Sequence, residues 1–358
     1  MSTARVVAVI PAHNEEASIG DTIRSLERQS SPPSQVFVVC DNCADDTAGV
    51  AAASGAKVLT TAGNTARKAG ALNQALTTIL PSLSDSDLIL VMDADSRISM
   101  DWIEYASELL GGRSDAGSVC GVFFGEHGGG FIGQLQRNEY FRYSREVYRH
   151  RQAPVLSGTG TLFRVSALLM ISSERGGSLP GDHGDFYDSH ALTEDNEITL
   201  ALKMLGFRCL AGVGCETVTE IMPGWRPLWK QRLRWQKGTL SDLRRYGINQ
   251  VTLPYWSKQI RLYGMFLMSI ACWSIMGAGI VQHPGFNLVW SAAILAASFL
   301  DRLWNVRKAG PAGMILSVLT LPELLYDVFR MAVFFRALAD AMTGRDVDWG
   351  HLNRSVRS

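Results

Sequence analysis

The sequence predicts an α/β domain with a mainly parallel sheet, followed by apolar helices that can enter a membrane. Over residues 5 to about 214, apolar runs of strand length alternate with segments of helical periodicity, as in a sheet covered by helices. Beyond residue 247 the composition becomes nearly all apolar or small over stretches of helix length. The 358 residues are enough for one large domain and a smaller second part.

The first third of the chain carries the clearest alternation of strands and helices. Its short runs rich in Val, Ile and Leu are typical of buried strands, and the segments between them repeat apolar residues with helical spacing. We expect strands at residues 6–10, 36–40, 58–60 and 88–92. We expect helices near residues 17–29, 45–53, 68–80 and 102–110.

Charge and cysteine content narrow the class of protein. Lys plus Arg and Asp plus Glu both number 34, so no overall field favours nucleic acid as a partner. The six cysteines form no dense framework, which favours a reduced, cytosol-facing domain, and residues 1–5 show no signal peptide. Cys40 and Cys43 have the spacing of a zinc or redox pair, but no second pair or matching His accompanies them, so we interpret them as thiols beside a strand end.

Three apolar stretches follow the α/β region. A spanning helix needs about 20 apolar residues, so residues 260–281 qualify and residues 288–300 are marginal, even when extended to 304. Residues 314–338 are doubtful because Pro322 and Glu323 interrupt them.

Basic residues predict the orientation of these stretches. They flank the outer ends of the first two, at Lys258, Arg261, Arg302, Arg307 and Lys308. Since cytoplasmic loops are enriched in Lys and Arg, both ends of this hairpin are expected in the cytosol. We expect the last stretch to be re-entrant or interfacial, because a full span would carry Arg345, Arg354 and Arg357 of the tail across the membrane.

Acidic residues follow three of the expected strands. Glu15 comes after the first, Asp41 after the second, and Asp93 and Asp95 after the fourth. Ligands of open α/β sheets bind beyond the carboxyl ends of the strands. Two carboxylates separated by one residue can face a hard divalent cation that shares its ligands with substrate phosphates. The alternative is that Asp95 only caps the next helix.

A cation and a second acidic cluster open two further helices. Lys68 stands at a helix start, where free N–H groups favour anions, and suits a diphosphate; alternatively it forms a solvated basic pair with Arg67. Asp195, in the segment Thr193-Glu194-Asp195-Asn196-Glu197, is a candidate general base. Alternatively, this segment is a helix cap with acidic residues in the first turn.

The segment Gln231-Arg232-Leu233-Arg234-Trp235 lies in an expected helix rich in cations and aromatic residues, over residues 229–246. This composition is also typical of a helix on a membrane surface. Both interpretations can hold on different faces of the helix.

In their order along the chain, these segments resemble the family 2 glycosyltransferases. The order is Pro-x-x-Asn-Glu from Pro11, a post-strand Asp, Lys-Ala-Gly-x-Leu-Asn, Asp-x-Asp, Thr-Glu-Asp and Gln-x-x-Arg-Trp, and then apolar helices. More narrowly it is similar to the membrane-integrated branch that contains cellulose, hyaluronan and poly-N-acetylglucosamine synthases. The resemblance covers residues 5–245 by motif and the remainder by layout.

The resemblance implies a GT-A nucleotide-sugar-binding domain, Rossmann-like, with C-terminal membrane helices. We therefore expect a cytosolic catalytic domain over residues 1–225 and an amphipathic interface region with the Gln-x-x-Arg-Trp motif over residues 226–258. Transmembrane or membrane-associated helices are expected over residues 259–340, and a C-terminal tail over 341–358.

Donor-binding roles are implied for the residues that match the family motifs. Ala12 and Glu15 would line the nucleoside, and Asp41 would contact the base. Lys68 would lie near the diphosphate, and Asp93 would touch the nucleotide.

Metal, base and acceptor roles follow in the same way. Asp95, together with Asp93, would hold Mg²⁺ or Mn²⁺ at the diphosphate, and Asp195 would deprotonate the acceptor hydroxyl. The motif residues on the later helix would close the site over donor and acceptor: Gln231, Arg234 and Trp235. The residues implied on the acceptor side are Gly158, Thr159, Glu194 and Trp235.

The implied function is inverting transfer of a sugar from a nucleoside-diphosphate sugar, expected to be a UDP-sugar. The acceptor is a hydroxyl of a lipid-linked or growing glycan at the cytosolic face of an inner or plasma membrane that the chain crosses several times. Membrane lipids and a second copy of the chain are the other expected partners, and nucleic acid is not one.

Three alternatives stay open. A polyprenyl-phosphate sugar synthase shares the fold but usually lacks Gln-x-x-Arg-Trp, and an inactive assembly subunit would keep the fold without turnover. A nucleotidyltransferase is disfavoured because no Gly-rich basic loop lies near Pro11. The chain also departs from the family: Asn42 replaces the second post-strand acid, no N-terminal membrane helix is seen, and the few C-terminal stretches argue against an export channel in a monomer.

Overall fold

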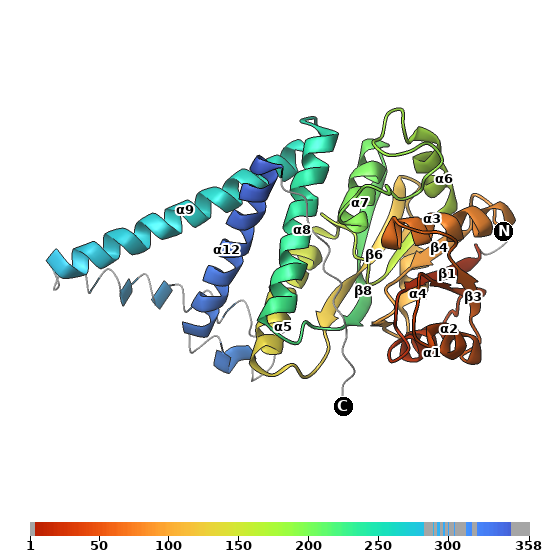
Figure 1. Cartoon of the computed structure of the whole chain (residues 1–358), viewed down its shortest axis with the longest axis horizontal. Coiled ribbons are helices and arrows are strands. Elements are labelled where there is room, and N and C mark those ends of the chain that lie inside the picture. The colour runs from red at the N-terminus through yellow and green to blue at the C-terminus, as the bar shows by residue number, and fades with distance from the viewer. Residues whose placement is uncertain are drawn as a thin grey trace. The chain divides into compact units, whose positions relative to one another are not determined.

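The computed structural model describes residues 4–282 and 321–344, together with residues 289, 292, 293, 296, 297, 300, 304 and 313–316 (Figure 1). The chain divides into two compact units. The first comprises Met1–Glu126 and Tyr143–Ile221, and the second comprises His127–Arg142 and Met222–Ser358.

The first unit contains one eight-stranded sheet in the order β3-β2-β1-β4-β7-β6-β8-β5. One half of the sheet consists of four parallel strands. In their order across the sheet they are β3 (Lys57–Thr60), β2 (Gln35–Cys40), β1 (Val6–Ala12) and β4 (Leu88–Val91). These are the four strands expected from the sequence. Their carboxyl ends therefore meet at one edge of the sheet.

The other half of the sheet is mixed. β7 (Thr161–Arg164) runs antiparallel to both β4 and β6 (Ala116–Gly125). β8 (Arg208–Thr219) is parallel to β6, and the short β5 (Ser96–Ile98) pairs antiparallel with β8. The expectation of a mainly parallel sheet is thus right for the first four strands. Beyond β4 the sheet is mixed, because β7 and β5 pair antiparallel with their neighbours.

Helices α1 to α4 of the first unit lie close to the four helical segments expected from the sequence, whereas α5 and α6 were not predicted. α1 (Ile19–Glu27), α2 (Thr47–Ala53) and α4 (Trp102–Gly111) contribute side chains to one buried cluster with β1 and β4. α3 (Arg67–Ile79) packs on β1 and β2 and ends in a short 3₁₀ turn, η1 (Leu80–Ser82). α6 (Val165–Glu174), α7 (Glu194–Met204) and the second half of α5 (Gly130–His150) complete the unit.

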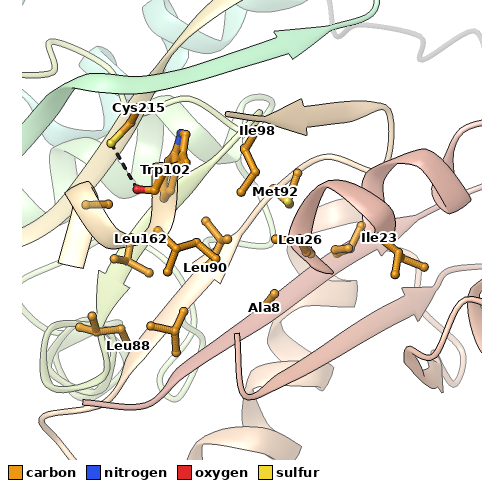
Figure 2. Close-up of a cluster of buried hydrophobic side chains, with 14 of the residues drawn as sticks. Ala8, Ile23, Leu26, Leu88, Leu90, Met92, Ile98, Trp102, Leu162 and Cys215 are labelled. Carbon is orange, nitrogen blue, oxygen red and sulfur yellow. Dashed lines mark hydrogen bonds between the residues drawn. The ribbon is translucent and has the colours of Figure 1, made fainter. Parts of the chain in front are cut away.

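The buried cluster fixes the end of β4. Figure 2 shows Trp102 beside Ile98 and Cys215, whose thiol lies 3.4 Å from the carbonyl oxygen of Trp102. Met92 and Ala94 belong to the same cluster and are buried. Burial of these two residues holds the segment after β4 in place, so the polar residues interleaved with them have defined positions.

The second unit is helical. It contains α8 (Trp225–Tyr246), α9 (Leu253–Gln282), α12 (Leu321–Thr343) and the first half of α5. α8 packs against α12. The hydrophobic core of the unit includes Leu135, Leu228 and Tyr326. The ring of Phe329 lies 5.0 Å from that of Trp225, centroid to centroid.

One helix of the described part of the chain is long and apolar enough to cross a membrane. It covers Leu253–Gly279 within α9, with a mean hydropathy of 1.5 and none of its most apolar window buried. Residues 321–338 of the third apolar stretch belong to α12, where Pro322 occupies the first turn, a position that tolerates Pro. Most of residues 288–304, and the tail with Arg345, Arg354 and Arg357, lie outside the described residues.

Candidate functional site

The segment after β4 carries Asp93 and Asp95. Both carboxylates are half-buried, on either side of the buried Ala94. Ser96 begins strand β5, and the next helix, α4, has Asp101 at its N-cap. The alternative that Asp95 caps the next helix is therefore wrong.

Lys68 lies among three carboxylates that come from two other parts of the chain. Its Nζ is 2.7 Å from Asp93 Oδ1, 2.7 Å from Glu194 Oε1 and 3.9 Å from Asp195 Oδ1. Burial by itself would lower the pKa of Lys68, but the charges of Asp195, Asp93 and Glu194 raise it well above its usual value. Lys68 is thus a permanently charged group inside an acidic cluster, and the alternative of a solvated pair with Arg67 is wrong.

Gly158 closes this cluster from the loop before β7. Its carbonyl oxygen accepts a hydrogen bond from the backbone N–H of Asp93 at 2.8 Å. A Cβ atom added to Gly158 would lie 2.7 Å from Lys68 Nζ and 2.7 Å from Asp195 Oδ2. Cβ contacts this short are not seen in proteins, so the missing side chain lets Lys68 and Asp195 approach each other. Next to it, Thr159 Oγ1 and Ser157 Oγ share a hydrogen bond at 2.6 Å.

The first turn of α7 supplies the acidic residues. Thr193 is the N-cap residue, but it makes no side-chain cap hydrogen bond, and its hydroxyl is buried without a partner in the described structure. The positive end of the helix dipole favours Glu194 and Asp195 at this position. The capping interpretation is right for the N-cap position of Thr193 and the acidic first turn, but no side-chain cap forms, and the contacts of Lys68 account for where the two carboxylates point.

A buried ion pair between Arg175 and Glu197 holds α7 in place. Arg175 and Glu197 are both fully buried, and Arg175 Nη2 lies 2.7 Å from Glu197 Oε2. The same guanidinium donates to the carbonyl oxygens of Pro180, at 2.7 Å, and Phe186, at 3.1 Å. Arg175 therefore holds the loop over residues 176–189 against the helix that carries Asp195. Glu197 stands in an acidic motif, but no sequence pattern points to Arg175.

Asn73 of α3 holds the same loop from its other side. Its Oδ1 accepts hydrogen bonds from the backbone N–H groups of Phe186, at 3.0 Å, and Tyr187, at 2.8 Å, and its Nδ2 donates to Tyr187 O at 2.8 Å. Asn73 is the last residue of the Lys-Ala-Gly-x-Leu-Asn motif. A polar residue on the buried face of an expected helix is the sequence signal that could have indicated its structural role.

Tyr187, which Asn73 positions, is buried close to the acidic cluster. Burial and the charge of Asp195 raise its pKa well above the usual value, and the charge of Lys68 only partly opposes them. Its ring packs edge-on against Phe163, with centroids 6.5 Å apart. Tyr187 is thus a neutral phenol beside charged groups, and no sequence pattern predicts its presence there.

Asp41 lies at the carboxyl end of β2 as expected. Its Oδ1 accepts hydrogen bonds from Thr61 Oγ1 at 2.7 Å, Asn64 Nδ2 at 2.8 Å and Asn42 Nδ2 at 3.1 Å. Asn42 also donates to Asn64 O at 3.1 Å, and its φ is 50°. Asn tolerates this left-handed conformation, and an acid at position 42 would lack the donor and repel Asp41. Asn42, where the family pattern has a second acid, thus makes contacts that an ionised acid could not make.

Ala12 and Glu15 lie at the end of β1, next to β2. Ala12 is buried, and its carbonyl oxygen accepts from the backbone N–H of Asp41 at 2.8 Å. The backbone N–H of Glu15 donates to Thr47 Oγ1 at 2.8 Å, and Glu15 Oε2 accepts from Ser18 Oγ at 2.7 Å. The structure thus brings Ala12, Glu15 and Asp41 to the same edge of the sheet as Asp93.

The remaining candidates belong to the second unit. Gln231, Arg234 and Trp235 lie on α8, and their spacing of three and four residues places them on one face of the helix. All three side chains are half-buried.

The fit of a divalent cation depends on Asp93 and Asp95. In the part of the chain that the structure describes, no three His, Cys, Asp or Glu side chains form a group that could hold a metal ion by themselves. Mg²⁺, however, is commonly held by one or two carboxylates and completes its shell with water and substrate phosphates. Two half-buried carboxylates with hard oxygen donors fit that mode of binding.

The sequence of the chain is similar to those of known glycosyltransferases. A family model described as "Glycosyltransferase like family 2" matches residues 4–238. A probable glycosyltransferase of Bacillus subtilis, YdaM, is 27% identical over 248 residues, which cover 65% of this chain and 55% of that protein. Poly-beta-1,6-N-acetyl-D-glucosamine synthase of Staphylococcus aureus is 23% identical over 243 residues, covering 65% and 54%. The chain therefore spans about half the length of these curated relatives.

The fold also matches a solved structure over nearly its whole length. The mannosyltransferase PcManGT from Pyrobaculum calidifontis, solved in complex with GDP-Man and Mn²⁺, superposes with a TM-score of 0.62. The match covers 96% of this chain and 88% of that chain at 16% sequence identity. At this identity the likeness concerns the fold.

Proposed function

The chain belongs to the glycosyltransferase-like family 2, and from this premise we propose that it transfers a sugar from a nucleoside-diphosphate sugar to an acceptor hydroxyl with inversion. The observation that carries the proposal is the position of Lys68, within 4 Å of the carboxylates of Asp93, Glu194 and Asp195. A cation for a diphosphate and a candidate base for a hydroxyl are thus found side by side.

The donor occupies the carboxyl ends of the parallel strands. Ala12 and Glu15 line the nucleoside, Asp41 contacts the base, and Lys68 pairs with the diphosphate. Lys68 is already held in place by its carboxylate partners, so little side-chain freedom is lost when a phosphate oxygen takes the place of one of them.

Asp93 and Asp95 hold the divalent cation, Mg²⁺ or Mn²⁺. When bound, such an ion offsets negative charge on the departing nucleoside diphosphate. Mn²⁺ accompanies GDP-Man in the solved mannosyltransferase, which supports the choice of ion. Lys68, close to Asp93, contributes a second positive charge for the same purpose.

Asp195 acts as the general base. One carboxylate oxygen accepts the proton of the acceptor hydroxyl while the hydroxyl oxygen bonds to the anomeric carbon. The bond from that carbon to the phosphate oxygen breaks, and the nucleoside diphosphate leaves with the electron pair. Glu194 is less suited to this role because Lys68 binds it directly at 2.7 Å, whereas the distance to Asp195 is 3.9 Å.

The acceptor side comprises Gly158, Thr159 and Glu194 of the first unit and Trp235 of α8. We assign Gln231 and Arg234, with Trp235, to the donor diphosphate and the acceptor, as the Gln-x-x-Arg-Trp motif implies. This motif favours extension of a glycan chain. The likeness to poly-beta-1,6-N-acetyl-D-glucosamine synthase supports a growing glycan as acceptor. A lipid-linked acceptor and a UDP-sugar donor belong to the same proposal.

The place of action is the cytosolic face of a membrane. The apolar surface of Leu253–Gly279 supports anchoring by α9, and Lys258 and Arg261 near its start favour the cytosolic side for that end. The proposed division is a catalytic domain over residues 1–225, an interface region over 226–258, membrane helices over 259–340 and a tail over 341–358. A multi-pass arrangement and self-association belong to the same proposal.

The test is a transfer assay with the full-length protein in detergent. Each of a panel of UDP- and GDP-sugars is supplied with Mg²⁺ or Mn²⁺, and nucleoside diphosphate release and product mass are measured with glycan and polyprenyl acceptors. Release with one donor and a lengthened or glycosylated acceptor is expected. A product with a sugar on polyprenyl phosphate would favour the alternative synthase, and absence of release with every donor would contradict the proposal.

A further inference from the structure

Arg232 is buried inside the Gln-x-x-Arg-Trp motif and contacts two of its residues. Its side chain is 5% exposed, and its Nη1 donates to Gln231 Oε1 at 3.1 Å. Its guanidinium carbon lies 4.2 Å from the centroid of the Trp235 ring, within the range of a cation–π interaction. Arg232, which lies within the motif, thus contacts the side chains of both Gln231 and Trp235.

Glu139 of α5 anchors this guanidinium. Arg232 Nη2 lies 2.8 Å from Glu139 Oε2, and Tyr326 of α12 donates its hydroxyl to the same oxygen at 2.6 Å. Arg330 Nε lies 3.6 Å from the other oxygen, Oε1. Burial by itself would raise the pKa of Glu139, but Arg232, Arg330 and Tyr326 outweigh it and bring the pKa to about 2. The carboxylate is therefore charged and fixed by two helices.

The orientation of Arg232 is set by these contacts rather than by full hydrogen bonding. Its Nε is buried and has no hydrogen-bond partner among the described residues. A buried donor without a partner is unfavourable. The orientation nevertheless places Nη2 at Glu139, Nη1 at Gln231 and the guanidinium carbon over the Trp235 ring.

We propose that Arg232 and Glu139 are positioning residues, which hold Gln231 and Trp235 in the orientation that sugar transfer requires. This inference rests on the proposed function of the motif. Glu139 fixes Arg232 by charge, and Arg232 fixes the amide of Gln231 by a hydrogen bond and the indole of Trp235 by a cation–π contact. Neither positioning residue needs to touch donor or acceptor.

A second ion pair on α8 is a matched control. Lys237 Nζ lies 3.1 Å from Asp340 Oδ2, and both side chains are 8% exposed. This pair joins α8 directly to α12, whereas the direct charge partner of Arg232 is Glu139 on α5. Lys237→Gln therefore removes a comparable buried ion pair from the same helix.

The experiment compares variants of the full-length protein in detergent. Single-turnover transfer, donor KM and melting temperature are measured for Arg232→Gln, Glu139→Gln and Lys237→Gln. We expect the first two to lower the transfer rate at least about tenfold and Lys237→Gln to change it less than about twofold, at similar losses in melting temperature. If Glu139→Gln does not fold, Tyr326→Phe replaces it, with an expected drop of about threefold.

A double variant separates positioning from general stabilisation. Residues that act through one another are not additive, so Arg232→Gln is expected to lower the rate less than about threefold when Trp235 is already Ala. Additive losses, or a normal rate for Arg232→Gln while Trp235→Ala is impaired, would overturn the inference and leave the proposed function intact. A normal rate for Trp235→Ala would overturn the role given to Trp235 and the inference with it, whereas no transfer by the unmodified protein would overturn the proposed function.

Discussion

Lys68 Nζ lies 2.7 Å from Asp93 Oδ1, and this ion pair joins the first turn of α3 to the segment that follows β4. The two residues are separated by 25 positions in the sequence and have no common secondary-structure element. Parallel strands bring them together because each strand delivers the residues after it to the same edge of the sheet.

Replacing Lys68 is expected to weaken donor binding. Lys68→Gln removes the cation proposed for the diphosphate and leaves three carboxylates without their shared partner. We expect the affinity for nucleoside diphosphate to fall at least about tenfold, with a smaller effect on the free nucleoside. Calorimetry with the two ligands measures the difference. Arg67→Asn is the control, because Arg67 is exposed and has a φ of 56°, which Asn tolerates. Unchanged affinity in Lys68→Gln would contradict the assignment of Lys68 to the diphosphate.

Replacing the two acids of α7 is expected to give different defects. Asp195→Asn removes the proposed base and should lower turnover by about 10²–10⁴-fold, while nucleotide binding with the metal ion stays near normal. Glu194→Gln removes a direct partner of Lys68 and should mainly alter donor affinity. Turnover and nucleotide affinity are measured for both variants. Normal turnover in Asp195→Asn would refute the base assignment.

A side chain at position 158 is expected to disturb the cluster without unfolding the protein. The Cβ of Gly158→Ala would meet the ends of Lys68 and Asp195, which can move away at small cost in stability. We expect turnover to fall at least about tenfold, because small displacements of reacting groups have large effects on rate. Gly111→Ala, where nothing lies within 4 Å of the added Cβ, should leave both rate and melting temperature unchanged. A fully active Gly158→Ala would show that the close approach is not needed.

The first half of the fold was predictable because its signals are local. The strands β1 to β4 and helices α1 to α4 follow from short apolar runs, helical spacing and the turns between them, and their ends agree within a few residues. The reversed direction of β7 was not predictable, because it depends on pairing with β4 and β6 far away in the sequence. No local pattern records which neighbour a four-residue strand selects.

The charged residues of the candidate site were predictable, and the residues that support them were not. Lys68, Asp93 and Asp195 follow or open regular elements, so their positions could be read from motif order. Tyr187 and Arg175 act through the loop over residues 176–189, which has no periodicity and is held by contacts with α3 and α7. Such contacts become visible only when the helices are placed in space.

The pH dependence of stability is expected to report on Asp87, which precedes β4. Burial by itself would raise its pKa, but hydrogen bonds from Ser84 and Arg5 lower it from 3.8 to about 2. A lowered pKa in the folded state stabilises the protein above the unfolded pKa, and this contribution, about 2 kcal/mol, is lost as the pH falls towards 2. The difference in unfolding free energy between the unmodified protein and Asp87→Asn should therefore shrink below about pH 4. A difference that is constant from pH 7 to 2.5 would contradict this origin.

The buried pair of Arg175 and Glu197 is expected to be the most sensitive point of the supporting structure. Glu197→Gln leaves a fully buried guanidinium without its counter-charge, which should lower the free energy of unfolding by about 3 kcal/mol. If the pair acts as a unit, the same substitution should cost much less when Arg175 is already Met. Thermal unfolding of the two single variants and the double variant measures this coupling. Strictly additive losses would show that the two residues stabilise the loop independently. In that case Asn73 and backbone contacts, rather than the ion pair, would link the loop over residues 176–189 to the helix that carries Asp195.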